Sequence, residues 1–98
     1  ANFWKSKRVM YKKGSEIINN PEGVWNIGIG IGDVIQIAGT DVIGGLGSSW
    51  HTMYISNIDY DNNTYILSYH SNETKSKKLS DIVRTSGYSK YYYVFFDM

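Results

Sequence analysis

The chain has 98 residues, which predicts a single domain or a half-domain over residues 1–98. Its 10 basic and 9 acidic residues nearly balance, so there is no electrostatic footprint for nucleic acid or an anionic membrane. Cysteine is absent, which excludes a disulfide framework or a thiolate metal site within these residues, and no stretch is apolar enough to predict a membrane span.

The composition favours a mainly β fold. Aromatic residues make up 15% of the chain and nine residues are tyrosine, a residue suited to half-buried sheet surfaces. The 10 glycines and the single proline indicate many tight turns. We therefore expect an antiparallel sheet or a partly open barrel.

The N-terminal part of the chain predicts little regular structure. Residues 3–13 mix aromatic, basic and apolar side chains, which favours a helical turn followed by extended chain. Gly14-Ser15 is expected to break this segment, and the Asn, Pro and Gly residues of 19–23 predict a turn.

Glycine marks the next segments. Residues 24–31 alternate Ile and Gly in part and are expected to be extended or looped up to a turn at Gly32. The Gly-x-Gly-x-Gly run that ends there lacks the strand–turn–helix context and the Lys-Ser/Thr ending of a phosphate loop, so no nucleotide cofactor is expected. A short strand at 33–37 and a Gly-rich loop at 39–49 follow.

The second half of the chain predicts a hairpin, a polar loop and a final strand. The expected elements are strands at 50–58 and 64–70 joined by a turn at 59–63, a polar loop at 71–80, a helical turn at 79–83 and a strand at 91–96. The last run is continuously aromatic and β-branched, which is typical of a strand buried on both faces.

The two histidines of the chain lie near the open end of this hairpin. A two-residue turn at 62–63 would pair Ile55 with His70. Because side chains alternate along a strand, His51, His70 and Asn72 would then share one face. A turn one residue longer would place His51 and His70 on opposite faces, so this geometry depends on the turn.

An imidazole beside a second polar group is the base and orienting half of a nucleophilic hydrolase. Periodicity alone favours a different interpretation, in which His51 is a half-buried structural residue of the strand and His70 lies on the surface. Two histidines without carboxylates at matching spacing do not make a zinc site, so no metal is expected.

Four motifs carry a family resemblance. They are GDVIQI at 32–37, WHTMYI at 50–55, YILSYHSN at 65–72 and LSDI at 79–82. In this order they resemble the C-terminal half of the amidase domain family, a branch of the papain-like cysteine hydrolases related to the NlpC-type and CHAP-type peptidoglycan hydrolases. The similarity covers about residues 24–96.

The resemblance implies the β half of a papain-like fold, which would be α+β when complete. It implies that His51 is the general base and that the orienting residue lies on the next strand, where His70 is preferred and Asn72 is the alternative. It further implies hydrolysis of an amide bond in a peptide or cell-wall substrate, by a bacterial protein that is secreted or held at the cell surface.

The chain departs from the family in one respect. The family's cysteine nucleophile begins a helix ahead of the Gly-Asp strand, whereas the 31 residues before Gly32 contain no cysteine. The start at Ala1 without Met favours a fragment whose cysteine lies on an N-terminal segment or a second chain, and which is inactive alone. The alternative is a non-catalytic cell-wall or protein-binding module. An incomplete sheet would also favour self-association through its unpaired edges.

Overall fold

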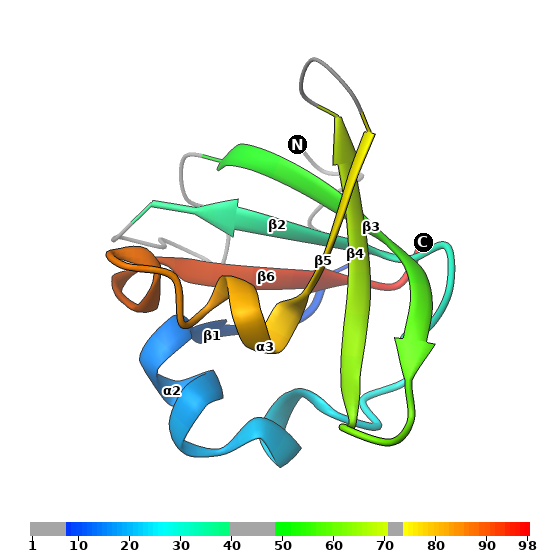
Figure 1. Cartoon of the computed structure of the whole chain (residues 1–98), viewed down its shortest axis with the longest axis horizontal. Helices are drawn as coiled ribbons and strands as arrows, with labels where there is room; N and C mark the ends of the chain where they lie inside the picture. The colour runs from blue at the N-terminus through cyan, green and yellow to red at the C-terminus, as the bar shows by residue number, and fades with distance from the viewer. Residues whose placement is uncertain (1–7, 40–48, 71–73) are drawn as a thin grey trace.

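The computed structural model describes residues 8–39, 49–70 and 74–98, which form a six-stranded antiparallel sheet (Figure 1). The strands are β1 (Arg8–Lys13), β2 (Val34–Ala38), β3 (Ser49–Asp59), β4 (Thr64–His70), β5 (Thr74–Lys78) and β6 (Tyr92–Phe96). Their order in the sheet is β1-β6-β2-β3-β4-β5, with β1 and β5 at its edges, so the sheet is not closed into a barrel. The expected mainly β, antiparallel fold is confirmed.

Short helical segments gather on one face of the sheet (Figure 1). They are α2 (Gly14–Asn19), η1 (Pro21–Val24), α3 (Leu79–Ile82) and η2 (Tyr88–Lys90). The Glu16 carboxylate accepts a hydrogen bond of 3.0 Å from the Lys13 backbone N–H at the start of α2, which satisfies a donor there. Within the described ranges, no helix has the length and apolar character needed to cross a membrane.

Strand β6 is an interior strand of the sheet, because it lies between β1 and β2. Its residues 93–96 are at most 1% exposed. Tyr93 and Phe95 enter the core beneath the helices, whereas Val94 and Phe96 form a second core on the opposite face. The prediction of a final strand buried on both faces is therefore confirmed.

The larger core fills the space between the sheet and the helices. It contains Ile35, Ile37, Met53, Ile55 and Leu67 from the strands, together with Ile17, Leu79, Ile82 and Val83 from the helical segments. This core fixes α3 against β4 and β5, and it thereby positions the residues discussed below.

The Gly32-Asp33 motif has a structural role at the start of β2. The Asp33 carboxylate accepts a hydrogen bond of 2.7 Å from the Gly30 backbone N–H and one of 2.9 Å from the Met98 N–H. Gly32 has a φ of +95°, a conformation that glycine adopts without steric cost. The motif therefore turns the chain into β2 and ties the C-terminal end of the described chain to it.

The expectation of a polar loop at 71–80 is wrong in part. Residues 74–78 of the expected polar loop form the edge strand β5, in which Lys77 pairs with Leu67 of β4. An edge strand is held by backbone hydrogen bonds, so a polar sequence suffices, and lysine is common at such edges. The extended segment ends at Gly14-Ser15, as predicted, and helix α2, which was not predicted, begins there. Glycine suits this position because a Cβ would lie 2.9 Å from the Tyr88 carbonyl oxygen.

Other expectations fall partly outside the described residues. Residues 8–13 are extended, as predicted, but the helical turn expected before them lies in 1–7, which the structure does not describe. The Gly-rich loop expected at 39–49 lies largely in residues 40–48, which are also outside the described ranges.

Candidate functional site

The turn of the β3–β4 hairpin is longer than the two residues predicted. Asp59 at the end of β3 pairs with Thr64 at the start of β4, so the turn contains the four residues 60–63. The Asp59 carboxylate accepts hydrogen bonds from the Asn62 backbone N–H at 3.2 Å and from its Nδ2 at 2.8 Å. Asn63 adopts a φ of +52°, which asparagine tolerates better than most residues. The longer turn is thus held by its own side chains.

A β-bulge in β3 shifts the pairing once more. The register changes between Ile55 and Asn57, and Ile55 pairs with Leu67 of β4. The predicted pairing of Ile55 with His70 is therefore wrong by three residues. Side chains alternate between the two faces of a strand. A shift by an odd number of residues therefore means that position 70 no longer shares a face with His51.

Tyr69, the residue before His70, contacts His51 from β4. The His51 and Tyr69 rings meet edge to face, with 4.9 Å between their centroids and 66° between their planes. Leu67 precedes Tyr69 on the same face of β4. The register does not place His70 beside His51, and Asn72 lies outside the described residues.

His51 lies at the rim of a cleft on the helix-covered face. It pairs with Ile37 of β2, whose side chain belongs to the core beneath the helices, and its own side chain is partly exposed. The cleft has a volume of about 150 Å³. Its lining includes His51, Met53, Tyr69, Lys77, Thr85 and Tyr88. Strands and the segment after α3 therefore both contribute to it.

Polar groups reach this cleft from separate parts of the fold. Lys77 comes from the edge strand β5, whereas Thr85 and Tyr88 come from the segment after α3. The Tyr93 hydroxyl donates a hydrogen bond of 3.0 Å to the Tyr88 carbonyl oxygen and so fixes η2 against β6. Burial raises the pKa of Tyr93, so its phenol remains a donor at neutral pH.

The arrangement suits proton transfer to or from a small polar group. Imidazole is the side chain best matched to proton exchange near neutral pH. Lys77 adds a cation to the cleft, and the Tyr69 ring packs against the imidazole edge. Within the described residues, no three or more His, Cys, Asp or Glu side chains gather in a way that could hold a metal ion.

The sequence motifs pointed to His51 but missed its surroundings. Tyr69 would have followed from the correct register, since it is next to His70 in the chain. Lys77 would have required β5 to be identified as a strand. No sequence motif marks Thr85 or Tyr88. The packing of α3 on the sheet brings them to the cleft.

Comparisons of the chain with models of protein families, with curated proteins and with solved structures found no match. The open antiparallel sheet and the cleft at His51 are therefore the observations from which a function is proposed.

Proposed function

We propose that this chain supplies the histidine-bearing half of a papain-like cysteine amidase or peptidase, with His51 as the general base. The observation that supports this most is the partly exposed His51 imidazole at the rim of a cleft on the helix-covered face of the sheet. The nucleophile is a cysteine on an N-terminal segment or a second chain, because the 98 residues contain none. The substrate is an amide bond in a peptide, with peptidoglycan stem peptides as the first candidate.

In this proposal His51 takes the proton of the cysteine thiol as the sulfur attacks the amide carbonyl carbon. The imidazolium then gives the proton to the leaving amine as the C–N bond breaks, which leaves the acyl group on the sulfur as a thioester. Water, deprotonated by His51, hydrolyses this thioester and regenerates the thiol. Tyr69 fixes the plane of the imidazole through its ring contact. Assignment of the tautomer-fixing partner to His70 or Asn72 stays a prediction.

The test uses the natural polypeptide that includes these residues and the cysteine. The His51→Gln variant keeps a polar side chain of similar size but cannot carry the proton. It should lower kcat/KM for release of amino groups from peptidoglycan by at least about 100-fold, with an unchanged melting temperature. The matched control is Thr52→Val, at the next residue, whose hydroxyl accepts a hydrogen bond of 3.1 Å from Gln36. This control should retain activity. Full activity of His51→Gln would contradict the proposal.

The alternative, a non-catalytic binding module, predicts a different result. It requires an exposed aromatic surface, and the Tyr91–Tyr93 run does not supply a complete one because Tyr93 is fully buried. Tyr54 is 41% exposed and lies on the face opposite to His51. Retention of the protein on peptidoglycan that is lost in Tyr54→Ala and kept in His51→Gln, without any hydrolysis, would favour this alternative.

A further inference from the structure

Lys77 brings a positive charge to the cleft at His51 from the edge strand β5. In the sheet it pairs with Leu67 of β4, whose side chain is buried in the core beneath the helices. Residues directly opposite each other in an antiparallel pair share a face, so the Lys77 side chain leaves the sheet on the face that carries His51. The register and the lining of the cleft therefore agree on the position of Lys77, and its side chain is exposed to solvent there.

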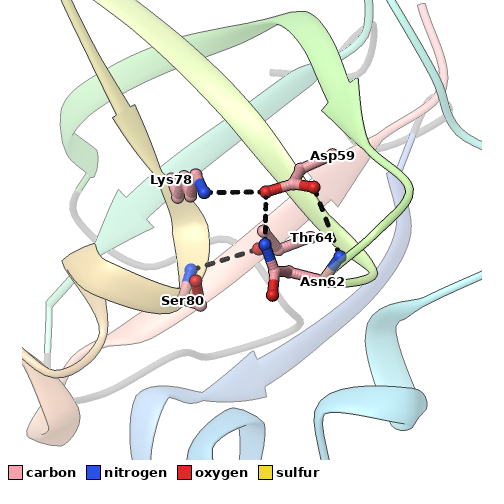
Figure 2. Close-up of polar contacts among 5 residues, drawn as sticks. All are labelled: Asp59, Asn62, Thr64, Lys78 and Ser80. Carbon is pink, nitrogen blue, oxygen red and sulfur yellow. Dashed lines mark hydrogen bonds and ion pairs between the residues drawn. The ribbon is translucent and has the colours of Figure 1, made fainter.

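The next lysine along the chain is already engaged, as Figure 2 shows. The Lys78 ammonium nitrogen lies 2.7 Å from Oδ2 of Asp59 beside the hairpin turn. Lys78, together with Asn62, lowers the pKa of Asp59 to about 2, so this carboxylate is ionised and the ion pair is present at neutral pH. Lys77 differs, because no carboxylate in residues 8–39, 49–70 and 74–98 forms an ion pair with it. The positive charge at the cleft is therefore open to a ligand.

The rest of the lining does not neutralise Lys77. Among the described residues that line the cleft, none carries a carboxylate. The Thr85 hydroxyl donates a hydrogen bond of 3.1 Å to the backbone carbonyl oxygen of Asp81, so its proton is in use. An ammonium group only donates hydrogen bonds, and it binds best to a charged acceptor. A single lysine therefore matches a ligand group with one negative charge, such as a carboxylate.

The spacing of the strands separates Lys77 from the reacting centre proposed at His51. Strand β4 lies between β3 and β5, so the backbones of these two residues are at least about 10 Å apart. Lys77 thus stands at the edge of the sheet, to one side of the imidazole. A group held there belongs to a neighbouring part of the substrate and not to the amide that is cleaved.

We propose that Lys77 is a specificity-determining residue, which binds a carboxylate on the peptide residue next to the scissile amide. This inference rests on the proposed amidase function, because it names a substrate group that is recognised at the same site. His51 carries the proton in the reaction, whereas Lys77 holds the substrate through a charge-assisted hydrogen bond. A peptide with a carboxamide in place of that carboxylate is then a poorer substrate.

The test uses the natural polypeptide that includes the cysteine, and two stem peptides that differ at one group. The acid is L-Ala-D-isoGlu-L-Lys-D-Ala as its C-terminal amide, and its partner has D-isoGln in place of D-isoGlu. Wild-type kcat/KM, measured by chromatography of the products, should be about tenfold higher for the acid, as expected for one charged hydrogen bond partly screened by water. The difference should lie in KM, since the bond is present before and during the reaction. Equal kcat/KM for the two peptides, or cleavage of neither, would overturn the inference.

Variants separate Lys77 from general effects of charge. Lys77→Gln should raise KM for the acid about tenfold and leave the kinetics of the amidated peptide unchanged, with an unchanged melting temperature. Lys77→Arg keeps the charge and should keep most of the preference. The matched control is Lys90→Gln, at an exposed lysine of η2 that does not line the cleft, and it should behave as the wild type. An equal fall in kcat for both peptides in Lys77→Gln would place this residue at the reacting carbonyl and overturn the inference.

The His51→Gln variant distinguishes this inference from the proposed function. If His51→Gln loses activity on both peptides while Lys77→Gln still prefers the acid, the inference on Lys77 fails and the amidase function stands. If His51→Gln is fully active, the proposed function fails, and the inference fails with it. Loss of activity in His51→Gln together with loss of the preference in Lys77→Gln supports both.

Discussion

The hydrogen bond from the Tyr65 hydroxyl to the Val24 carbonyl oxygen gives a sharp test of how the fold is held together. It is 2.7 Å long, and it joins β4 to η1 across 41 residues of sequence. Both residues are at most 4% exposed. Tyr65→Phe removes the hydroxyl and leaves the carbonyl oxygen buried without this donor, which costs about 1–3 kcal/mol.

That cost can be measured as a change in the free energy of unfolding. For a chain of this size, each 1 kcal/mol lowers the melting temperature by about 4–8 °C, so Tyr65→Phe should lose at least about 4 °C. The matched control is Tyr60→Phe, because Tyr60 is 73% exposed and its hydroxyl can bond to water. The control should stay within about 0.5 kcal/mol of the wild type. Urea titration and calorimetry would each report the difference.

The same residue makes a prediction about alkaline pH. Burial, aided by the nearby Asp33 charge, raises the pKa of Tyr65 to about 12. An unfolded tyrosine ionises near a pKa of about 10, so the folded state holds this proton more tightly, and stability should fall as the pH rises from about 10 to 12. Tyr65→Phe should show a shallower fall over that interval. A loss no larger than that of Tyr60→Phe, together with an unchanged alkaline slope, would refute the assigned hydrogen bond.

Three further predictions concern stability. Asp59→Asn should destabilise the fold at neutral pH, because it removes the carboxylate that bonds to Lys78. The bond to Lys78 lowers the pKa of Asp59 to about 2, so the difference in stability from wild type should shrink as the pH falls from about 4 to about 2. A difference in urea midpoint that does not change with pH would contradict this. Gly14→Ala should lower the free energy of unfolding by about 1–3 kcal/mol, because the added Cβ would lie 2.8 Å from the backbone of η2. The control Gly23→Ala, whose Cβ would lie 3.5 Å from its nearest atom, should change the urea midpoint little. Leu67→Ala, at a fully buried site, should cost about 2–5 kcal/mol by calorimetry, and a cost below about 1 kcal/mol would contradict its place in the core.

Local patterns were sufficient to predict most of the strands. The continuous aromatic run of β6 and the alternating run of β4 report side-chain burial, which depends on each residue's own position in a pleated strand. The β5 strand was missed because its side chains are mostly polar and its pairing uses the backbone alone. Helix α2 was missed because glycine at its start also signals a chain break, and only contact with η2 shows why glycine is there.

The residues around His51 were less accessible to sequence analysis. His51 itself was identified from its motif and its place at the start of β3. Its partner on β4 was predicted from a register that assumed a two-residue turn. The longer turn, held by Asp59, and the bulge in β3 change that register, so Tyr69 contacts His51. A single unpaired residue inverts the facing of every residue beyond it, so small local choices decide which side chains meet.

By itself, the sequence determined the class of the fold and the burial of its final strand on both faces, and it singled out His51 as a candidate, because alternation, composition and motif order are properties of neighbouring residues. Only the tertiary structure decided the register of the hairpin and the lining of the cleft at His51. Lys77 and Thr85 come from separate segments of the chain, yet both line the cleft at His51. Such placements arise from the packing of α3 on the larger core, which joins segments far apart in the sequence and which no local pattern encodes.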